Sequence, residues 1–260
     1  MAEILLTSAF AVAALMALLW LVSLARADAS VVDIAWGPGF AVVGLIAAVV
    51  GDGVPARRWL VAALSGLWGL RLGLYLAWRN HGKGEDWRYR AMRARHGSAF
   101  RWKSAYLVFA LQGALMWFIS LPLQVAAAAP APASLGLLDA LGVALFALGF
   151  YFESVGDWQL ARWKADPANA SRVMDRGLWR YTRHPNYFGD ACVWWGLYAI
   201  ALATPGGWLT VPSPVLMTFL LLRVSGVVLL ERGLAKRRPE YADYVRRTSA
   251  FIPLPPRGRA

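Results

Sequence analysis

The chain has 260 residues, of which 58% are apolar and only 16% charged, a composition that excludes an ordinary water-soluble domain because such domains carry roughly 25% charged residues. Its 27 Lys and Arg residues against 15 Asp and Glu residues give a net charge of +12, but no nucleic-acid-binding motif accompanies that charge, so we expect no nucleic-acid partner. Three histidines and one cysteine, which form no cluster along the chain, also predict that there is no metal site.

Seven apolar runs follow one another, separated by segments in which glycine and proline are common. Most runs have the roughly 20 residues that a helix needs to cross a hydrocarbon core of about 30 Å. The sequence therefore predicts an all-α fold, a polytopic membrane helical bundle of about seven transmembrane helices that forms a single domain, residues 1–260. The predicted spans are Ile4–Leu24, Val31–Val50, Trp59–Trp78, Ser104–Ala128, Leu135–Val155, Phe188–Ala203 and Trp208–Leu230.

Basic residues gather in the segments that follow the third, fifth and seventh spans. Segments 79–103, 157–187 and 231–260 hold eight, six and eight of the 27 Lys and Arg residues. Loops rich in Lys and Arg stay in the cytosol, where anionic lipid headgroups attract them. The pattern predicts an N-terminus outside, a cytosolic C-terminus and membrane lipids as partners.

The second and third predicted spans each carry a polar residue of a catalytic type. Asp33 lies near the cytosolic start of the second span, where an acid is costly and indicates function. Pro38, which has a glycine on each side, can open backbone groups toward a cavity nearby. An N-cap at the membrane surface is the other interpretation of Asp33. Tyr75 in the third span is either a substrate contact or a packed side chain with a locally satisfied hydroxyl.

The most specific stretch of the sequence is RHPNYFGD, residues 183–190. Proline at position 185 restricts His184 to an extended backbone and predicts a helix start within a few residues. Arg183 and His184 beside the free N–H groups of a helix start attract an anion such as phosphate or carboxylate. Asn186 and Asp190 lie four residues apart, so both can face one ligand. The same pieces also occur in a basic loop before an ordinary capped helix, which is the alternative.

Two acids lie at the cytosolic ends of later spans. Asp157 follows the fifth span and Glu231 follows the seventh. An acid that faces the bundle at membrane depth indicates function, whereas an acid in an interfacial ion pair marks only the membrane boundary. The sequence leaves both interpretations open for both residues.

Several of these stretches resemble the steroid 5-alpha-reductase superfamily, including its bacterial members of unassigned function. The similar stretches are GLWRYTRHPNYFGD at 177–190, EYADYV at 240–245 with Phe-Ile-Pro at 251–253, and the segment from Arg71 to Tyr89. The resemblance is strong from Asp157 onward and around residues 71–93, and weak in the first two spans.

The resemblance implies an NADPH-dependent integral membrane reductase that transfers hydride to an activated carbon–carbon double bond of a steroid-like or other hydrophobic enone. It implies substrate-side helices in residues 1–128, cofactor-binding helices and cytosolic loops in residues 129–260, a substrate that enters from the lipid, and an active site open to the cytosol of a bacterial inner membrane. The chain has no Gly-x-Gly-x-x-Gly unit between a strand and a helix, so this nicotinamide site is not a Rossmann site. The residues expected to hold NADPH are Asp157, Leu160, Lys164, Arg172, Arg183, His184, Asn186, Tyr187, Asp190, Glu231 and Tyr244.

In the reductases an acid on the second span and a tyrosine on the third polarise the substrate carbonyl. Here Trp36 stands where the acid is expected and Trp68 where the tyrosine is expected, with Asp33 and Tyr75 displaced along their helices. We therefore predict Asp33, Trp36 and Tyr75 as the catalytic residues, in a geometry that a different hydrophobic enone fits as well as a steroid does.

Two other functions remain open. Isoprenylcysteine and phospholipid methyltransferases carry a similar Arg-His-Pro-x-Tyr segment, a late glutamate and a tyrosine-containing tail, so His184, Glu231 and Tyr244 also suit an S-adenosylmethionine-dependent membrane methyltransferase. The tryptophans at positions 36 and 68 favour a third possibility, a non-catalytic lipid-binding protein that keeps the fold.

Overall fold

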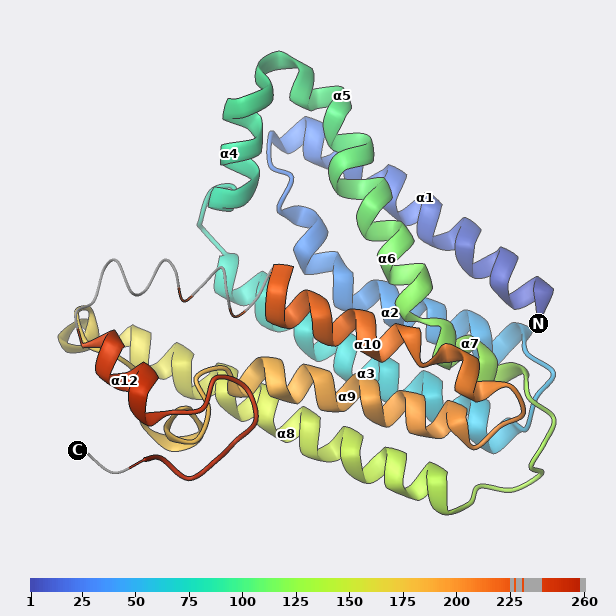
Figure 1. The fold of residues 1–260 in the computed structure, drawn as a ribbon. Coiled ribbons are helices and arrows are strands. Elements are labelled where there is room, and N and C mark those ends of the chain that lie inside the picture. The colour runs from blue at the N-terminus through green and yellow to red at the C-terminus, as the bar shows by residue number, and fades with distance from the viewer. Residues whose placement is uncertain (225–226, 228–230, 232–239, 258–260) are drawn as a thin grey trace. The chain divides into compact units, whose positions relative to one another are not determined.

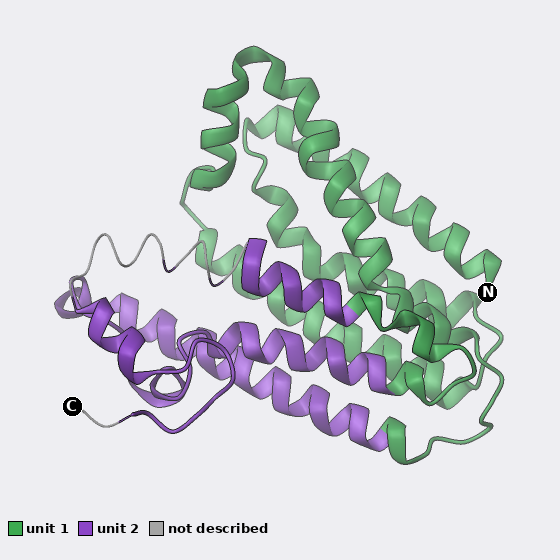
Figure 2. Cartoon of the chain, viewed as in Figure 1, with its two compact units in different colours: residues 1–139, 200–213 green, residues 140–199, 214–260 purple. Residues whose placement is uncertain are grey.

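The computed structural model describes residues 1–224, 227, 231 and 240–257, and these residues are mainly helical. Within this part of the chain, pairing of the β type is limited to one isolated bridge between Thr182 and Ser249. The all-α prediction is therefore confirmed for the residues described. The chain divides into two compact units, residues 1–139 with 200–213 and residues 140–199 with 214–260 (Figure 2). These units are defined by packing, so the division into substrate-side and cofactor-binding helices after residue 128 stays a prediction.

The first unit contains the helices of the N-terminal half of the chain, drawn from blue to green in Figure 1. They are α1 (Ala2–Arg26), α2 (Val31–Val50), α3 (Pro55–Asn80), α4 (Trp87–His96), η1 (Gly97–Ala99), α5 (Phe100–Ser104), η2 (Ala105–Ala110), α6 (Leu111–Ile119), α7 (Leu121–Ala128) and η5 (Gly207–Thr210). Segment η2 is a π-helical stretch, a local widening of the helix that often occurs at functional sites.

Helices α2 and α3 approach each other closely through small residues. A Cβ atom added at Gly37 would lie 2.4 Å from the carbonyl oxygen of Gly69, and one added at Gly69 would lie 2.2 Å from the carbonyl oxygen of Gly37. Small residues at a helix contact let two backbones pack closely in a membrane, where the hydrophobic effect does not drive helix association. These glycines therefore fix where the start of α2, which carries Asp33, lies against α3.

A buried ion pair ties the start of α3 to the first turn of α8, and further bonds of the same arginine reach the loop before α8. The guanidinium of Arg57 donates from Nε to Asp139 Oδ1 at 2.9 Å and from Nη2 to Oδ2 at 3.1 Å. Its other N–H groups reach the carbonyl oxygens of Pro132 and Ser134, both at 3.0 Å. Arg57 is 0% exposed and Asp139 1%, so the pair is stable only because every group has a partner.

The second unit contains the remaining helices, drawn from yellow to red in Figure 1. Their bounds are α8 (Leu137–Ala165), η3 (Pro167–Asn169), η4 (Gly177–Arg180), α9 (Pro185–Leu202), α10 (Pro212–Phe219), η6 (Leu220–Val224) and α12 (Tyr241–Arg247), with the first residues of α8 and α10 and the last of α9 in the first unit. Glycines again set the closest approach, because a Cβ atom at Gly149 of α8 would lie 2.4 Å from the carbonyl oxygen of Gly189 in α9.

Among the described residues, six helical segments are long and apolar enough to cross a membrane, so the chain is an integral membrane protein. They are Ala2–Arg26, Val31–Val50, Pro55–Asn80, Trp87–Ala128, Leu137–Ala165 and Gly207–Val224. Large apolar side chains on their surface, such as Phe10 and Leu74 at 77% and 72% exposure, suit contact with lipid. The predicted sixth span forms as α9 but is not among the six, and its first turns carry Asn186 and Asp190.

Candidate functional site

Asp33 lies in the first turn of α2 and binds two side chains from α4. Its Oδ2 accepts a hydrogen bond from Arg88 Nη2 at 2.7 Å, and its Oδ1 accepts one from the hydroxyl of Tyr89 at 2.8 Å. The hydroxyl of Tyr89 accepts a further bond from Gln112 Nε2 at 3.0 Å. An acid, a guanidinium and a phenol are therefore held together in the first unit.

Residues of the loop before α4 hold this cluster in place. Glu85 accepts a bond from the backbone N–H of Ala29 at 2.8 Å and a two-point bond from the guanidinium of Arg93. Burial alone would raise the pKa of Glu85, but the hydrogen bonds from Arg93 and Ala29 outweigh it and lower that pKa. Asp86 caps α4 by accepting from the N–H of Arg88 and also binds its Nε at 2.8 Å. The α1–α2 turn and the start of α4 are thus fastened to each other.

Trp36 lies one helical turn beyond Asp33 and offers an open hydrogen-bond donor. Its ring packs edge-on against Phe40, with centroids 5.1 Å apart, and Phe40 in turn contacts Trp68. The indole N–H of Trp36 is buried and has no hydrogen-bond partner among the described residues. A buried donor without a partner is costly, so this one is suited to an oxygen atom of a ligand.

Tyr75 lies apart from the contacts just described. The guanidinium of Arg71 lies 5.5 Å from the centre of its ring and that of Arg79 lies 5.8 Å away. In the structure Tyr89 binds Asp33, while the catalytic prediction for Tyr75 stays a prediction. Sequence reasoning missed Tyr89 and Arg88 because they lie in a segment whose charge was explained by topology.

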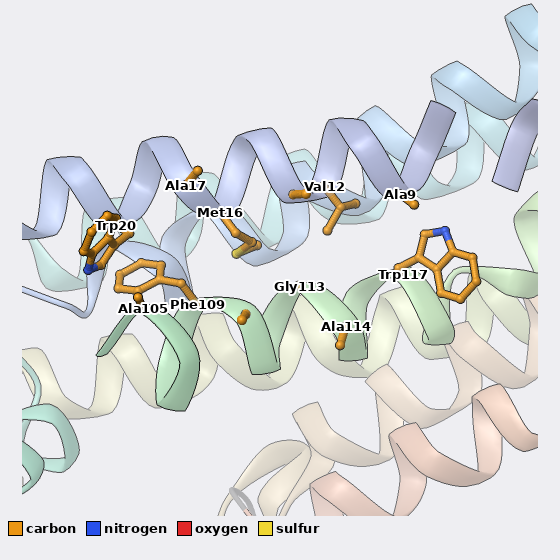
Figure 3. Close-up of a pocket in the computed structure, with 12 residues that line it drawn as sticks. Ala9, Val12, Met16, Ala17, Trp20, Ala105, Phe109, Gly113, Ala114 and Trp117 are labelled. Atoms are coloured by element: carbon orange, nitrogen blue, oxygen red, sulfur yellow. The ribbon is translucent and has the colours of Figure 1, made fainter. Parts of the chain in front are cut away.

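An apolar groove of about 480 Å³ runs between α1 and the helical segment η2–α6 (Figure 3). Trp20 and Trp117 lie toward its two ends, and Met16 and Phe109 line the part between. Both indole N–H groups are already bonded, that of Trp20 to the carbonyl oxygen of Arg101 and that of Trp117 to the carbonyl oxygen of Leu5. No titratable side chain lines the groove, so it suits an apolar chain or ring system.

In the second unit, Asp157 of α8 and Asn186 of α9 form a polar pair at the start of α9. Asn186 Nδ2 donates to Asp157 Oδ1 at 3.1 Å, and Asp157 is 5% exposed. Helix α9 begins at Pro185, as the sequence predicted, and Gly156 lets this turn approach α8. The pair confirms that Asp157 faces another helix; it is not a solvated boundary residue.

Arg183, His184 and Glu231 form a second polar cluster. Arg183 binds both carboxylate oxygens of Glu231, at 2.7 and 3.2 Å, and His184 Nε2 lies 3.1 Å from Glu231 Oε1. Arg183 also donates to the carbonyl oxygens of Val245 and Thr248 at the end of α12. The guanidinium that the sequence assigned to an anionic ligand therefore serves the attachment of the C-terminal segment.

Aromatic residues complete this cluster. The ring of Tyr187 stacks on that of His184, with centroids 5.5 Å apart and planes 5° from parallel. The hydroxyl of Tyr244 donates to the carbonyl oxygen of Trp179. Burial, together with the nearby Tyr241, raises the pKa of Tyr244, so its phenol stays protonated at neutral pH. Tyr244 is thus a buried support for the loop that carries Arg183.

The pKa of Glu231 leads to a test of this cluster. Burial alone would raise that pKa, but the hydrogen bonds and charges of His184 and Arg183 outweigh burial and lower it to about 2 from an ordinary 4.5. A lowered carboxylate pKa stabilises the fold above the ordinary pKa and ceases to do so as pH falls toward the lowered one. We expect Glu231→Gln to lower the free energy of unfolding at pH 7 by about 1–2 kcal/mol, a figure reduced for partial exposure.

The measurement is denaturant-induced unfolding in detergent between pH 7 and pH 3. The difference between wild type and Glu231→Gln is expected to shrink as pH falls below about 4.5. Glu240→Gln, which removes an exposed charge at the start of α12, is the matched control with little effect at any pH. A difference that does not change with pH would mean that the ion pair is not what Glu231 contributes.

The other predicted cofactor residues lie on the same helices or on the loop between them. Leu160 and Lys164 follow Asp157 along α8 at helical spacing, and Asp190 lies one turn after Asn186 on α9. The guanidinium of Arg172 lies 5.9 Å from the ring centre of Trp163. For these residues the cofactor contacts stay a prediction.

Arg172 lines a cavity of about 600 Å³ at the C-terminal end of α8. Arg162, Arg176 and the indole of Trp163 line the same cavity. The indole N–H of Trp163 is buried and makes no hydrogen bond within the described part of the chain. Three guanidinium groups and one open N–H suit an anionic, phosphate-bearing ligand.

Comparison with known proteins identifies the family of the chain, but that family has no known function. A family model described as a protein of unknown function (DUF1295) matches residues 19–248. No similar protein was found among curated proteins, and no similar chain among solved structures.

Proposed function

We propose a function on the premise that the chain belongs to the DUF1295 family. The protein is proposed to be an NADPH-dependent membrane reductase, which transfers hydride to the activated carbon–carbon double bond of a hydrophobic, steroid-like or other enone. The proposal takes up the resemblance of residues 71–93 and 157–253 to the steroid 5-alpha-reductases. Under this proposal, the protein lies in the bacterial inner membrane, and its C-terminus and nucleotide site are on the cytosolic side.

The observation that carries the proposal is the buried pair of Asp157 and Asn186. Burying a carboxylate to 5% exposure in an apolar helix bundle costs free energy, and a residue that is kept despite that cost indicates function. With the amide of Asn186 at 3.1 Å, the pair offers acceptors and donors that suit a ribose hydroxyl or the carboxamide of nicotinamide. His184 and Tyr187, whose rings stack on each other, flank Asn186 in the chain.

The arginine-lined cavity supports the anionic part of the proposal. Arg172 and Arg162 line it beside the open indole N–H of Trp163. Guanidinium groups bind phosphate oxygens in two-point contacts, and a buried N–H without a partner gains a hydrogen bond when such an oxygen arrives. NADPH, when bound, supplies the hydride; these residues bind and orient its phosphates.

The polar residues of the first unit support activation of the enone. When hydride adds to the double bond, negative charge develops on the carbonyl oxygen, and fixed N–H and O–H donors aimed at that oxygen lower the barrier. Trp36 presents an indole N–H that has no partner in the described chain, and Arg88 presents a guanidinium that Asp33 holds in place. The apolar groove between α1 and α6 suits the body of a substrate that enters from the lipid (Figure 3).

A thermal-shift comparison of cofactors tests this proposal. We expect NADPH at 100 times its Kd to stabilise the detergent-purified protein by about 2.7 kcal/mol, a rise of several degrees in Tm. Asn186→Ala and Arg172→Ala are expected to remove most of that rise, whereas Arg246→Ala, an exposed residue of α12, leaves it intact. Equal melting with and without NADPH would overturn the proposal.

One observation favours a second candidate, an S-adenosylmethionine-dependent methyltransferase. His184 and Glu231 are in contact, at 3.1 Å, and both belong to the residues that such enzymes share with this chain. In the same thermal-shift experiment, stabilisation by S-adenosylmethionine without stabilisation by NADPH would select this function. Stabilisation by neither would favour the non-catalytic lipid-binding protein.

A further inference from the structure

A second basic pocket in the C-terminal unit shares Arg176 with the arginine-lined cavity, whereas its other charged residues have no role in the proposed cofactor or substrate site. It has a volume of about 500 Å³ and is formed by three chain segments: the loop that leads into η4, the end of α12, and the tail that follows α12. Its charged lining residues are Asp175, Arg176, Arg180, Arg247 and Arg257.

Hydrogen bonds of the backbone and of Thr182 help to hold these three segments together. The N–H of Arg257 donates to the carbonyl oxygen of Arg247 at 2.9 Å, and the N–H of Leu254 donates to that of Tyr181 at 3.0 Å. Thr182 binds the carbonyl oxygen of Phe251 through its hydroxyl at 2.8 Å. The fold therefore places four guanidinium groups around one hollow, although their like charges repel one another.

Acidic residues compensate only one of the four arginines. Arg247 binds Asp243 at 2.7 Å and lies 3.7 Å from Asp175. For Arg176, Arg180 and Arg257, no carboxylate lies within ion-pair distance in the part of the chain that the structure describes. The guanidinium carbon of Arg176 lies 5.6 Å from the ring centre of Trp163, a cation–π contact that does not neutralise its charge. The lining thus carries a net positive charge that a bound anion would neutralise.

We propose that this pocket binds a phosphate group through Arg176, Arg180 and Arg257. Guanidinium groups match phosphate oxygens in geometry and charge better than any other side chain does. Apolar residues of the same tail, Ile252 and Leu254, are 60% and 53% exposed, and exposed apolar side chains beside a basic pocket suit a lipid at the membrane surface. The headgroup of an anionic phospholipid and a free phosphate are the two sources of such a group.

The test compares the double variant Arg180→Gln/Arg257→Gln with Arg246→Gln, a matched control. Arg246 lies next to Arg247 on α12, is 72% exposed at its side chain, and does not line the pocket. The first arm measures Tm in a neutral detergent with inorganic phosphate, with sodium chloride adjusted to hold ionic strength constant. The second arm measures Tm in nanodiscs of phosphatidylcholine with and without phosphatidylglycerol.

We expect a rise of about 5 °C for wild type in at least one arm, and loss of at least half of that rise in the double variant but not in the control. A rise in both arms, or with phosphatidylglycerol alone, identifies the lipid headgroup as the source, and a rise with phosphate alone identifies a free phosphate. No rise in either arm, or an equal loss in the double variant and the control, would overturn the proposal. Because Arg180 and Arg257 do not line the arginine-lined cavity proposed for NADPH, the loss in the double variant is independent of whether the protein binds NADPH.

Discussion

Replacing Arg57 by alanine is expected to lower the free energy of unfolding by about 3–5 kcal/mol, the largest effect on stability that we predict. The change leaves Asp139 buried at 1% exposure without its guanidinium, and it leaves the carbonyl oxygens of Pro132 and Ser134 without their donor. A buried carboxylate that loses its partner retains the full cost of its removal from water. Unfolding in mixed micelles with increasing SDS measures the loss.

Two further variants separate the ion pair from a general effect of removing arginine. Arg57→Met with Asp139→Leu replaces both partners by apolar side chains, and we expect it to recover most of the lost stability because no unpaired charge remains. Arg58→Ala, one residue along α3, removes a side chain that binds only the carbonyl oxygen of Gly51 and is expected to cost about 1 kcal/mol. A double variant as unstable as Arg57→Ala would contradict this explanation.

Replacing Trp36 by phenylalanine is expected to lower turnover of hydrophobic enones about 100-fold while leaving stability nearly unchanged. The change keeps an aromatic ring against Phe40 but removes the buried N–H that has no partner in the described chain. Loss of one donor to a developing oxyanion costs roughly 10²–10³ in kcat. Oxidation of NADPH, followed by its absorbance with a panel of enones that includes a 3-oxo-4-ene steroid, measures turnover.

The control for this variant should behave in the opposite way. Trp195→Phe removes an indole N–H that already donates to the hydroxyl of Thr218 at 3.1 Å, so we expect it to lower stability by about 1 kcal/mol and to leave turnover unchanged. Unchanged turnover in Trp36→Phe would assign the activation of the carbonyl to other donors. Comparison of Tyr89→Phe with Tyr75→Phe would then identify the phenol concerned.

Hydrophobicity made most of the helices predictable. The span expected over Val31–Val50 coincides with α2, and α1, α3 and α9 begin or end within a few residues of the expected positions. The fifth span was predicted to end at Val155, where the apolar run ends, but α8 continues to Ala165. Hydrophobicity indicates which turns lie in lipid and does not indicate where the helix itself ends. The number of spans depends on α9, where polar residues in the first turns give a weaker signal than the other helices carry.

The polar contacts were much less predictable, because they join residues that are far apart in sequence. Asp33 was identified as a functional acid, yet its partners Arg88 and Tyr89 lie 55 and 56 residues further along the chain. Arg57 was overlooked because the third span was expected to begin at Trp59, which placed Arg57 in a loop, whereas α3 begins at Pro55.

Arg183 shows the same limit for a residue that was recognised. Its charge and its place before α9 predicted an anionic ligand, and the structure gives it an anion, the carboxylate of Glu231. A charge pattern specifies that a guanidinium needs a partner, but only the fold determines whether that partner is a ligand or another residue of the chain. Asp157 and Asn186 were recognised from their motif, and the packing of α8 against α9 brings them together.

Calorimetric titration of NADPH into the detergent-purified protein tests the central claim most directly, since it requires no knowledge of the substrate. The account predicts one site per chain with a Kd in the micromolar range, at least tenfold weaker binding in Asn186→Ala, and unchanged binding in Trp36→Phe, whose change lies in the first unit. No heat of binding for NADPH, or the same Kd in wild type and Asn186→Ala, would contradict it.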